Sequence, residues 1–290
     1  METNQTVVVI TGMHRSGTSL TTSLLQSAGV FIGDRLLGSD PGNPRGHFED
    51  LDFLEFHQQL LRSQGLSDEG WMDNRGKPIS KADVTSAQNL IAQRKDYQLW
   101  GWKDPRTCLF LDFWSQLLPT AKYIFVYRSP WQVVDSLFRR GDLAFQINPD
   151  LAIQTWINYN QKILDFCATT VQPWILLPIE DVIESPQLAV DAINQQLALN
   201  LRSPQNLYDA SLFQTNPVNL YQAQIVQQRY PQAFALYRRL HSQATFLEES
   251  SLPTAYSSRL IPWLWQNWLD RPIPRLKAVR YWLKLKKIKQ

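Results

Sequence analysis

The hydrophobic residues of this 290-residue chain fall into short runs that are separated by longer amphipathic stretches. Four runs rich in β-branched or aromatic residues predict strands at 7–11, 98–103, 122–127 and 174–179. The run at 122–127 is almost continuously apolar, which is typical of a strand buried on both faces of a parallel sheet. Four strands spaced this far apart need helical crossovers between them.

The intervening segments have helical spacing and helix-end signals. They predict helices at 20–28, from the acids at 49–50 to about 62, and at 81–95, 109–118, 130–140, 150–170, 187–199 and 220–247. Strands that alternate with helices predict a three-layer α/β/α fold with a central parallel sheet. Such sheets bind ligands at the carboxyl ends of their strands, where we expect Gly12, Lys103, Arg128 and Glu180.

The segment Gly12–Ser19 follows the first strand and leads into the first helix. Strand, tight glycine loop and helix form the layout of a phosphate-binding loop, in which backbone N–H groups and a helix N-terminus converge on an anion. The two glycines have the Walker A spacing, but Thr18 and Ser19 stand where that motif requires Lys-Ser/Thr. The basic residue, Arg15, lies inside the loop instead. The pattern favours a phosphate-containing ligand other than ATP.

A second anion-binding pattern follows the third predicted strand. Arg128 comes directly after that strand, and Ser136 lies eight residues later, in the second turn of the next helix. An arginine fork and a hydroxyl at this separation can hold a second phosphate group. An arginine at a strand end is more often part of a structural ion pair, so the pattern gains weight only beside the loop at 12–19.

Composition and charge divide the chain into two parts. A content of 44% hydrophobic and 19% charged residues is typical of a folded globular protein. Residues 271–290 carry eight basic residues and no acid, whereas the rest carries 21 basic and 26 acidic residues. We expect one α/β domain over 1–250 and a Trp-rich basic tail over 251–290. The tail is interpreted either as a packed C-terminal helix, or as an amphipathic segment on an anionic inner membrane surface, or as a dock for an acidic acceptor.

The cysteines and the N-terminus bear on location. Cys108 and Cys167 lie far apart in apolar surroundings and in no metal-ligand spacing, which indicates buried thiols in a reducing compartment. The first twelve residues lack the features of a secretion signal or a membrane span. We expect a cytoplasmic protein, associated with the membrane only through 271–290, and no nucleic-acid partner.

The two phosphate-binding patterns resemble those of the sulfotransferases that use 3′-phosphoadenosine 5′-phosphosulfate (PAPS). The loop is similar to their 5′-phosphosulfate loop, and Arg128 through Ser136 resembles their 3′-phosphate motif. The stretch Ile179-Glu180-Asp181, followed by a Pro-initiated helix, is similar to one found in bacterial members. The resemblance covers about residues 6–200 and is nearest to the bacterial and Golgi-type branch. It implies a P-loop NTPase-like sulfotransferase fold.

The resemblance also implies roles for individual residues. The donor contacts that it implies are His14, Arg15, Ser16, Gly17, Thr18, Ser19, Arg128 and Ser136. Arg15 and Lys103 would lie at the transferring group, and Glu49 is interpreted as the general base in preference to His47. The Arg-Lys-Gly motif of cytosolic members is missing, which leaves a third 3′-phosphate contact unassigned, with Arg238 or Arg239 as candidates.

The chemistry expected of such a site is PAPS-dependent transfer of a sulfuryl group to an acceptor hydroxyl or amine, possible acceptors including carbohydrates and lipid-linked sugars. No metal is expected, because the sequence has no metal-ligand spacing. Two alternatives stay open. A P-loop kinase of a small hydroxyl compound would need Mg²⁺ and a substitute for the missing lysine, and a non-catalytic protein would bind the product PAP (3′-phosphoadenosine 5′-phosphate) or a glycan without turnover.

Overall fold

A computed structural model describes residues 5–39, 46–71, 77–205 and 219–246. The strands are β1 (Thr6–Thr11), β2 (Leu99–Lys103), β3 (Lys122–Tyr127) and β4 (Trp174–Pro178). The helices are α1 (Thr18–Ser27), α2 (Leu51–Ser63), α3 (Lys81–Ala92), the 3₁₀ helix η1 (Pro105–Phe110), α4 (Leu111–Leu117), α5 (Pro130–Arg140), α6 (Leu143–Ile147), α7 (Pro149–Thr169), α8 (Ile179–Glu184), α9 (Pro186–Leu197), α10 (Asn219–Arg229) and α11 (Pro231–Gln243). The predicted tail at 251–290 lies outside the described residues.

The four strands form one parallel sheet in the order β2-β1-β3-β4. β1 is central, with Val8 beside Gly101 of β2 and Lys122 of β3. Because all four strands run in the same direction, their carboxyl ends lie along one edge of the sheet. The loop after β1 and the residues that end β2 and β3 therefore meet at this edge.

Successive residues of each strand enter different cores, as the two-residue period of a strand requires. Val7 and Val9 of β1 belong to one buried cluster, whereas Val8 and Ile10 belong to another. The same alternation holds along β3, so both faces of the sheet are buried. This explains why the strands appear in the sequence as nearly continuous apolar runs.

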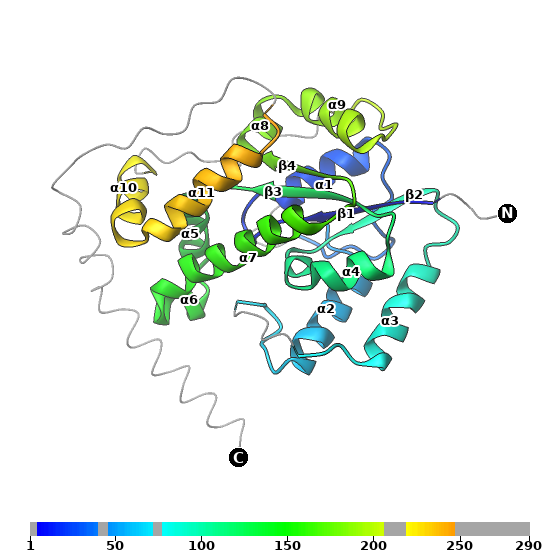
Figure 1. Cartoon of the computed structure of the whole chain (residues 1–290), viewed down its shortest axis with the longest axis horizontal. Helices are drawn as coiled ribbons and strands as arrows, with labels where there is room; N and C mark the ends of the chain where they lie inside the picture. Colours follow the sequence, from blue (N-terminus) through cyan, green and yellow to red (C-terminus); the bar gives the residue numbers. More distant parts are fainter. Residues whose placement is uncertain (1–4, 40–45, 72–76, 206–218, 247–290) are drawn as a thin grey trace, which may run out of the picture.

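Helices cover both faces of the sheet and complete three layers (Figure 1). Buried residues of α1, α8 and α9 share one core with their side of the sheet. Residues of α2, α4, α5, α7, α10 and α11 share the other, larger core. The predicted three-layer α/β/α fold with a central parallel sheet is confirmed. No helix in the described part of the chain is both long and apolar enough to cross a membrane.

Several helix boundaries differ from the predictions. The segment predicted as one helix at 109–118 begins earlier as η1, because Asp104 accepts a hydrogen bond from the Arg106 N–H and Pro105 fits the first turn. The single helix predicted at 220–247 is two helices, since Pro231 starts α11 and lacks the N–H that a continuous helix needs. The short helices α6 and α8 were not predicted.

Candidate active site

The candidate site lies along the carboxyl edge of the sheet. Gly12 follows β1 directly, Lys103 is the last residue of β2, and Arg128 follows β3. Glu180 stands in the first turn of α8, just beyond β4. The structure therefore brings all four predicted strand-end residues to the edge at which α/β sheets bind ligands.

The loop between β1 and α1 turns sharply at two residues. Arg15 has φ 67° and Gly17 has φ 88°, both in the left-handed region. At Gly12 an added Cβ would lie 2.1 Å from the Val126 carbonyl oxygen, so the loop passes too close to β3 for any side chain there. Gly17 precedes the first turn of α1 and offers no side chain to cap it. The N-terminal N–H groups of α1 are thus open to an anion.

Two buried serine hydroxyls at this edge lack hydrogen-bond partners among the described residues. Ser16 Oγ belongs to the loop after β1, and Ser129 Oγ belongs to the residue that precedes α5. Both side chains are almost completely buried. Buried hydroxyls nearly always have a partner, and these two stand beside Arg15 and Arg128 respectively. Their free hydrogen-bonding capacity fits an oxygen-rich ligand at both places.

The two predicted phosphate-binding patterns are in contact. Arg15 donates from Nε to Ser136 Oγ over 2.9 Å, which links the loop to the second turn of α5. Arg128 donates from Nε to Gln132 Oε1 over 3.1 Å. Burial raises the pKa of Glu180, and the positive charge of the nearby Arg128 offsets part of this rise. Gln132, Ser129 and Glu180 thus surround the Arg128 side of the site, and Gln132 and Ser129 were missed by sequence reasoning.

Glu49 and Lys103 form a buried ion pair. Lys103 Nζ donates to Glu49 Oε1 over 2.8 Å, between residues 54 positions apart in the sequence. Lys103 is 1% exposed and Glu49 is 5% exposed. The Cα of Lys103 is the register partner of Ile10, two residues before Gly12, so the pair lies beside the start of the loop. The structure therefore joins the predicted base to the predicted catalytic lysine.

Arg106 and Asp104 extend this pair to a cluster of four charges. Arg106 Nη1 lies 3.7 Å from Glu49 Oε2 and 3.0 Å from Asp104 Oδ1. Burial works against the charge of Arg106, but the carboxylates of Asp104 and Glu49 outweigh it and raise the pKa of Arg106. Two cations and two carboxylates balance, which is what allows so many charges to be buried together. Arg106 was not singled out from the sequence, where only its position after the Lys-Asp-Pro segment marks it.

The backbone before Glu49 departs from the predicted helix start. α2 begins at Leu51, and its N-cap is Asp50, whose Oδ1 accepts from the Asp52 N–H over 3.0 Å. Glu49 therefore precedes the helix and does not serve as its first-turn acid. Phe48 has φ 55°, which is rare for a bulky side chain and tends to occur at functional sites.

The histidines differ in their surroundings. The His14 ring packs edge-on against Trp71 at 4.7 Å and Tyr159 at 5.7 Å. Burial, followed by the charges of Arg106 and Arg140, holds the pKa of His14 well below its usual range. The backbone carbonyl of His47 accepts from Ser19 Oγ over 3.0 Å, which fastens α1 to the segment that carries Glu49.

Other predicted residues lie elsewhere or outside the described part. Arg239 donates to Gln161 Oε1 of α7 over 3.3 Å, and Arg238 is exposed on α11. The third 3′-phosphate contact therefore stays unassigned. Residues 40–45, between β1–α1 and Glu49, and the basic segment 271–290 are outside the described residues.

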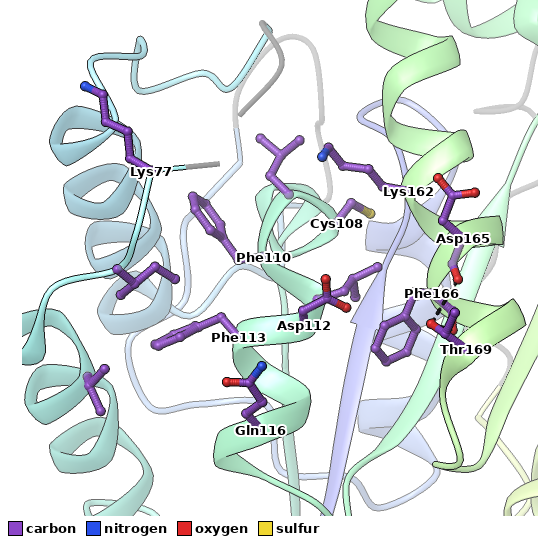
Figure 2. Close-up of a pocket in the computed structure, with 14 residues that line it drawn as sticks. Lys77, Cys108, Phe110, Asp112, Phe113, Gln116, Lys162, Asp165, Phe166 and Thr169 are labelled. Atoms are coloured by element: carbon purple, nitrogen blue, oxygen red, sulfur yellow. Dashed lines mark hydrogen bonds between the residues drawn. The ribbon is translucent and has the colours of Figure 1, made fainter. Parts of the chain in front are cut away.

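A cavity of about 810 Å³ lies beside η1 (Figure 2). Its labelled side chains come from the η1–α4 segment, from α7 and from the chain around Lys77. Cys108 lines this cavity, and its Sγ lies 3.1 Å from Thr11 Oγ1 at the end of β1. Burial raises the pKa of the Cys108 thiol to about 12, so it is not a nucleophile at neutral pH. No predicted donor-site residue lines the cavity.

The described residues contain no group of three or more His, Cys, Asp or Glu side chains placed to hold a metal ion. The prediction of metal-independent chemistry concerns the reaction itself and stays a prediction.

Comparison with known proteins gives one family match. The model of the sulfotransferase family matches residues 8–203, a range that contains every predicted donor-site and catalytic residue. The sulfotransferase domain of the olefin synthase from Synechococcus PCC 7002 is similar at 18% identity, over 86% of this chain and 95% of that one, with a TM-score of 0.46. Sulfotransferase STF1 from Mycobacterium tuberculosis H37Rv is similar at 14% identity over 68% of each chain, with a TM-score of 0.49. No curated protein sequence matches the chain.

Proposed function

The chain belongs to the sulfotransferase family, and we propose that it transfers a sulfuryl group from PAPS to a hydroxyl or amine of its acceptor. The observation that carries this proposal is the buried Lys103–Glu49 pair beside the open N-terminus of α1. The N-terminus of α1 can hold the donor's phosphosulfate. The Lys103–Glu49 pair can supply both a cation for the leaving group and a base for the acceptor.

The loop at 12–19 would hold the 5′-phosphosulfate. Backbone N–H groups at the start of α1, the Ser16 hydroxyl and the Arg15 guanidinium would surround its oxygens. The fit is supported by the buried Ser16 Oγ, which has no other partner among the described residues. A phosphosulfate oxygen would supply that missing partner.

Arg128 and Ser136 would hold the 3′-phosphate of the donor. Ser129 Oγ, which has no hydrogen-bond partner in the described part of the chain, follows Arg128 in the sequence and would add a hydrogen bond to the same phosphate. Gln132 accepts from Arg128 Nε and so helps to hold the guanidinium at the place proposed for this phosphate. A donor with both phosphates would thus span the Arg15–Ser136 contact.

Bound PAPS supplies an activated sulfuryl group and leaves as PAP. Glu49 would accept the proton of the acceptor as the acceptor oxygen or nitrogen bonds to sulfur and the sulfur–oxygen bond to the 5′-phosphate breaks. Lys103 and Arg15 would stabilise the negative charge that develops on the departing phosphate oxygen. No atom changes its oxidation state in this transfer.

This division of roles requires Lys103 to change partner. In the structure Lys103 Nζ donates a hydrogen bond to Glu49 Oε1, and a carboxylate oxygen that is paired with a cation in this way is a poor proton acceptor. Phosphosulfate at the loop would attract Lys103 Nζ and free Oε1 for the acceptor. Arg106, 3.7 Å from Oε2, would keep Glu49 paired with a cation.

The acceptor class, a cytoplasmic location and a role for 271–290 at an anionic membrane surface or an acidic acceptor stay predictions from the sequence. The proposed function itself is tested with ³⁵S-labelled PAPS and a panel of phenols, oligosaccharides, lipid-linked sugars and peptides. We expect label on at least one acceptor, with inhibition by added PAP. Transfer of phosphate from γ-labelled ATP to the same panel, together with no transfer of ³⁵S from PAPS, would contradict the proposal.

A further inference from the structure

His57 lies in the middle of α2 and is completely buried. Among the described residues, it forms no hydrogen bond with the loop at 12–19 or with Glu49. The Trp114 indole N–H donates to His57 Nε2 over 2.9 Å. Because an indole nitrogen can only donate, Nε2 must carry a lone pair. The proton of the neutral ring therefore lies on Nδ1, which is 3.0 Å from Asp104 Oδ2.

The carboxylate of Asp104 is divided between two neighbours. Oδ2 accepts from His57 Nδ1, while Oδ1 accepts from the backbone N–H of Arg106 over 2.8 Å and from its Nη1 over 3.0 Å. Burial alone would favour the protonated acid, but the charge of Arg106 and the bond from His57 hold the pKa of Asp104 well below its usual range. A neutral His57 leaves the cluster with two positive and two negative charges.

These contacts form one continuous series from the core to the proposed base. Trp114 fixes the tautomer of His57, His57 fixes Asp104, and Asp104 fixes the guanidinium of Arg106, which stands 3.7 Å from Glu49 Oε2. We propose that His57 and Asp104 are positioning residues, which act through Arg106 to hold Glu49 in place for proton transfer. This inference rests on the proposed function, because it assigns a role within the same site.

The series matters most once the donor is bound. Lys103 would then leave Glu49 for the phosphosulfate, and Arg106 would be the remaining cation beside a buried carboxylate. An unpaired buried carboxylate is strongly disfavoured and would move or take up a proton. An Arg106 that is held on both its backbone and side chain by Asp104 prevents this movement. Small misplacements of a catalytic group cost up to about 100-fold in rate.

The first test determines the tautomer of His57 by NMR. In protein labelled with ¹⁵N-histidine, long-range ¹H–¹⁵N correlation at pH 7.5 should show His57 with its proton on Nδ1, and His57→Leu assigns the signal. In Trp114→Phe the donor to Nε2 is removed, so the ¹⁵N shift of Nε2 should change, while the Asp104 carboxylate keeps a proton on Nδ1. A wild-type ring protonated on Nε2, or on both nitrogens, would overturn the proposal without any activity measurement.

The second test measures transfer from ³⁵S-PAPS. His57→Leu removes the donor to Asp104 at similar volume and should lower kcat roughly 10- to 100-fold with PAP affinity unchanged. His57→Asn places an amide N–H near the position of Nδ1 and should recover most of the rate. Phe56→Leu is the matched control, because Phe56 is buried one residue away on α2 and packs on the same Trp114 at 5.5 Å. It should lower the Tm and leave kcat near wild type.

A double-mutant cycle separates action through Arg106 from general damage. The loss caused by His57→Leu should largely disappear in an Arg106→Ala background. Losses that multiply, or an unimpaired His57→Leu enzyme beside an inactive Glu49→Gln enzyme, would overturn this inference alone. A wild-type protein that transfers no label would overturn the proposed function and this inference with it. If His57→Leu does not fold, His57→Asn and the wild-type tautomer decide the question.

Discussion

Arg15 Nε donates a hydrogen bond to Ser136 Oγ over 2.9 Å and so joins the loop after β1 to helix α5, 121 residues further along the chain. The two residues belong to the two patterns that we assign to the 5′- and 3′-ends of the donor. Their contact fixes the separation of these two subsites before any donor binds. A donor that carries both phosphate groups would therefore meet a site that is already arranged.

Ser136→Ala removes the hydroxyl from this contact. We expect PAP affinity to fall about tenfold, since the variant loses one hydrogen bond to a charged phosphate and the restraint on Arg15. Isothermal titration calorimetry with PAP measures the loss. Ser115→Ala, on the exposed side of α4, is the matched control and should bind PAP as the wild type does. An unchanged Ser136→Ala affinity would remove Ser136 from the donor site.

Arg128→Ala tests the 3′-phosphate assignment by comparing two ligands. PAP binding should weaken by about 2–3 kcal/mol, because a charge-assisted contact is lost. Adenosine 5′-phosphate lacks the 3′-group, so its affinity should hardly change. Arg139→Ala, a half-exposed arginine on the same helix that pairs with Asp135, serves as the control. Equal losses for both ligands would refute the assignment.

Catalysis should not depend on a divalent metal. The loop lacks the lysine that a P-loop kinase places on its phosphates, and Arg15, Lys103 and Arg128 supply positive charge in its place. The transfer rate should be the same in excess EDTA as in Mg²⁺. A rate that collapses in EDTA and returns with Mg²⁺ would favour the kinase alternative.

His14 should make stability depend on pH. Burial and the charges of Arg106 and Arg140 lower its pKa in the folded protein, so between this lowered value and the ordinary one the unfolded chain binds more protons. Stability should be complete above about pH 6.5 and decline as the pH falls from there. Urea unfolding at pH 7.5 and 5.5 measures the difference, which should be smaller for His14→Gln. An identical pH difference in the variant would show that His14 does not contribute.

Much of the fold could be predicted because the sheet is buried on both faces. Each strand is a nearly continuous apolar run. The glycines at 12 and 17 mark the loop after β1, because a side chain at 12 would clash with Val126 and residue 17 has a positive φ. The break at Pro231 was also present in the sequence, but a helical pattern on both sides of it concealed the break. The start of α2 was misplaced by one or two residues because Glu49, Asp50 and Asp52 are all acceptable near a helix N-terminus.

The candidate site was only partly predictable. Motifs identify residues close together in the sequence, such as Arg15 within its loop or Lys103 before Asp104. The Lys103–Glu49 pair joins segments 54 positions apart, and the His57–Asp104 bond joins segments 47 positions apart. A histidine on the apolar face of a helix gives no sign of its partner until α2 packs against η1. For the same reason the buried hydroxyl of Ser129, without a partner among the residues that the structure describes, could not be distinguished from an ordinary N-cap.

The most direct test of the proposed chemistry is single-turnover transfer from ³⁵S-PAPS by Glu49→Gln, with an acceptor that the wild type is shown to use. Glutamine keeps the shape of the side chain and removes the basic oxygen, so the rate should fall by about 10²–10⁴-fold while PAP affinity stays nearly unchanged. His47→Ala should lose much less, and Glu55→Gln, an exposed glutamate of α2, should lose nothing. Near wild-type transfer by Glu49→Gln beside an inactive His47→Ala would contradict the mechanism and give the role of base to the histidine.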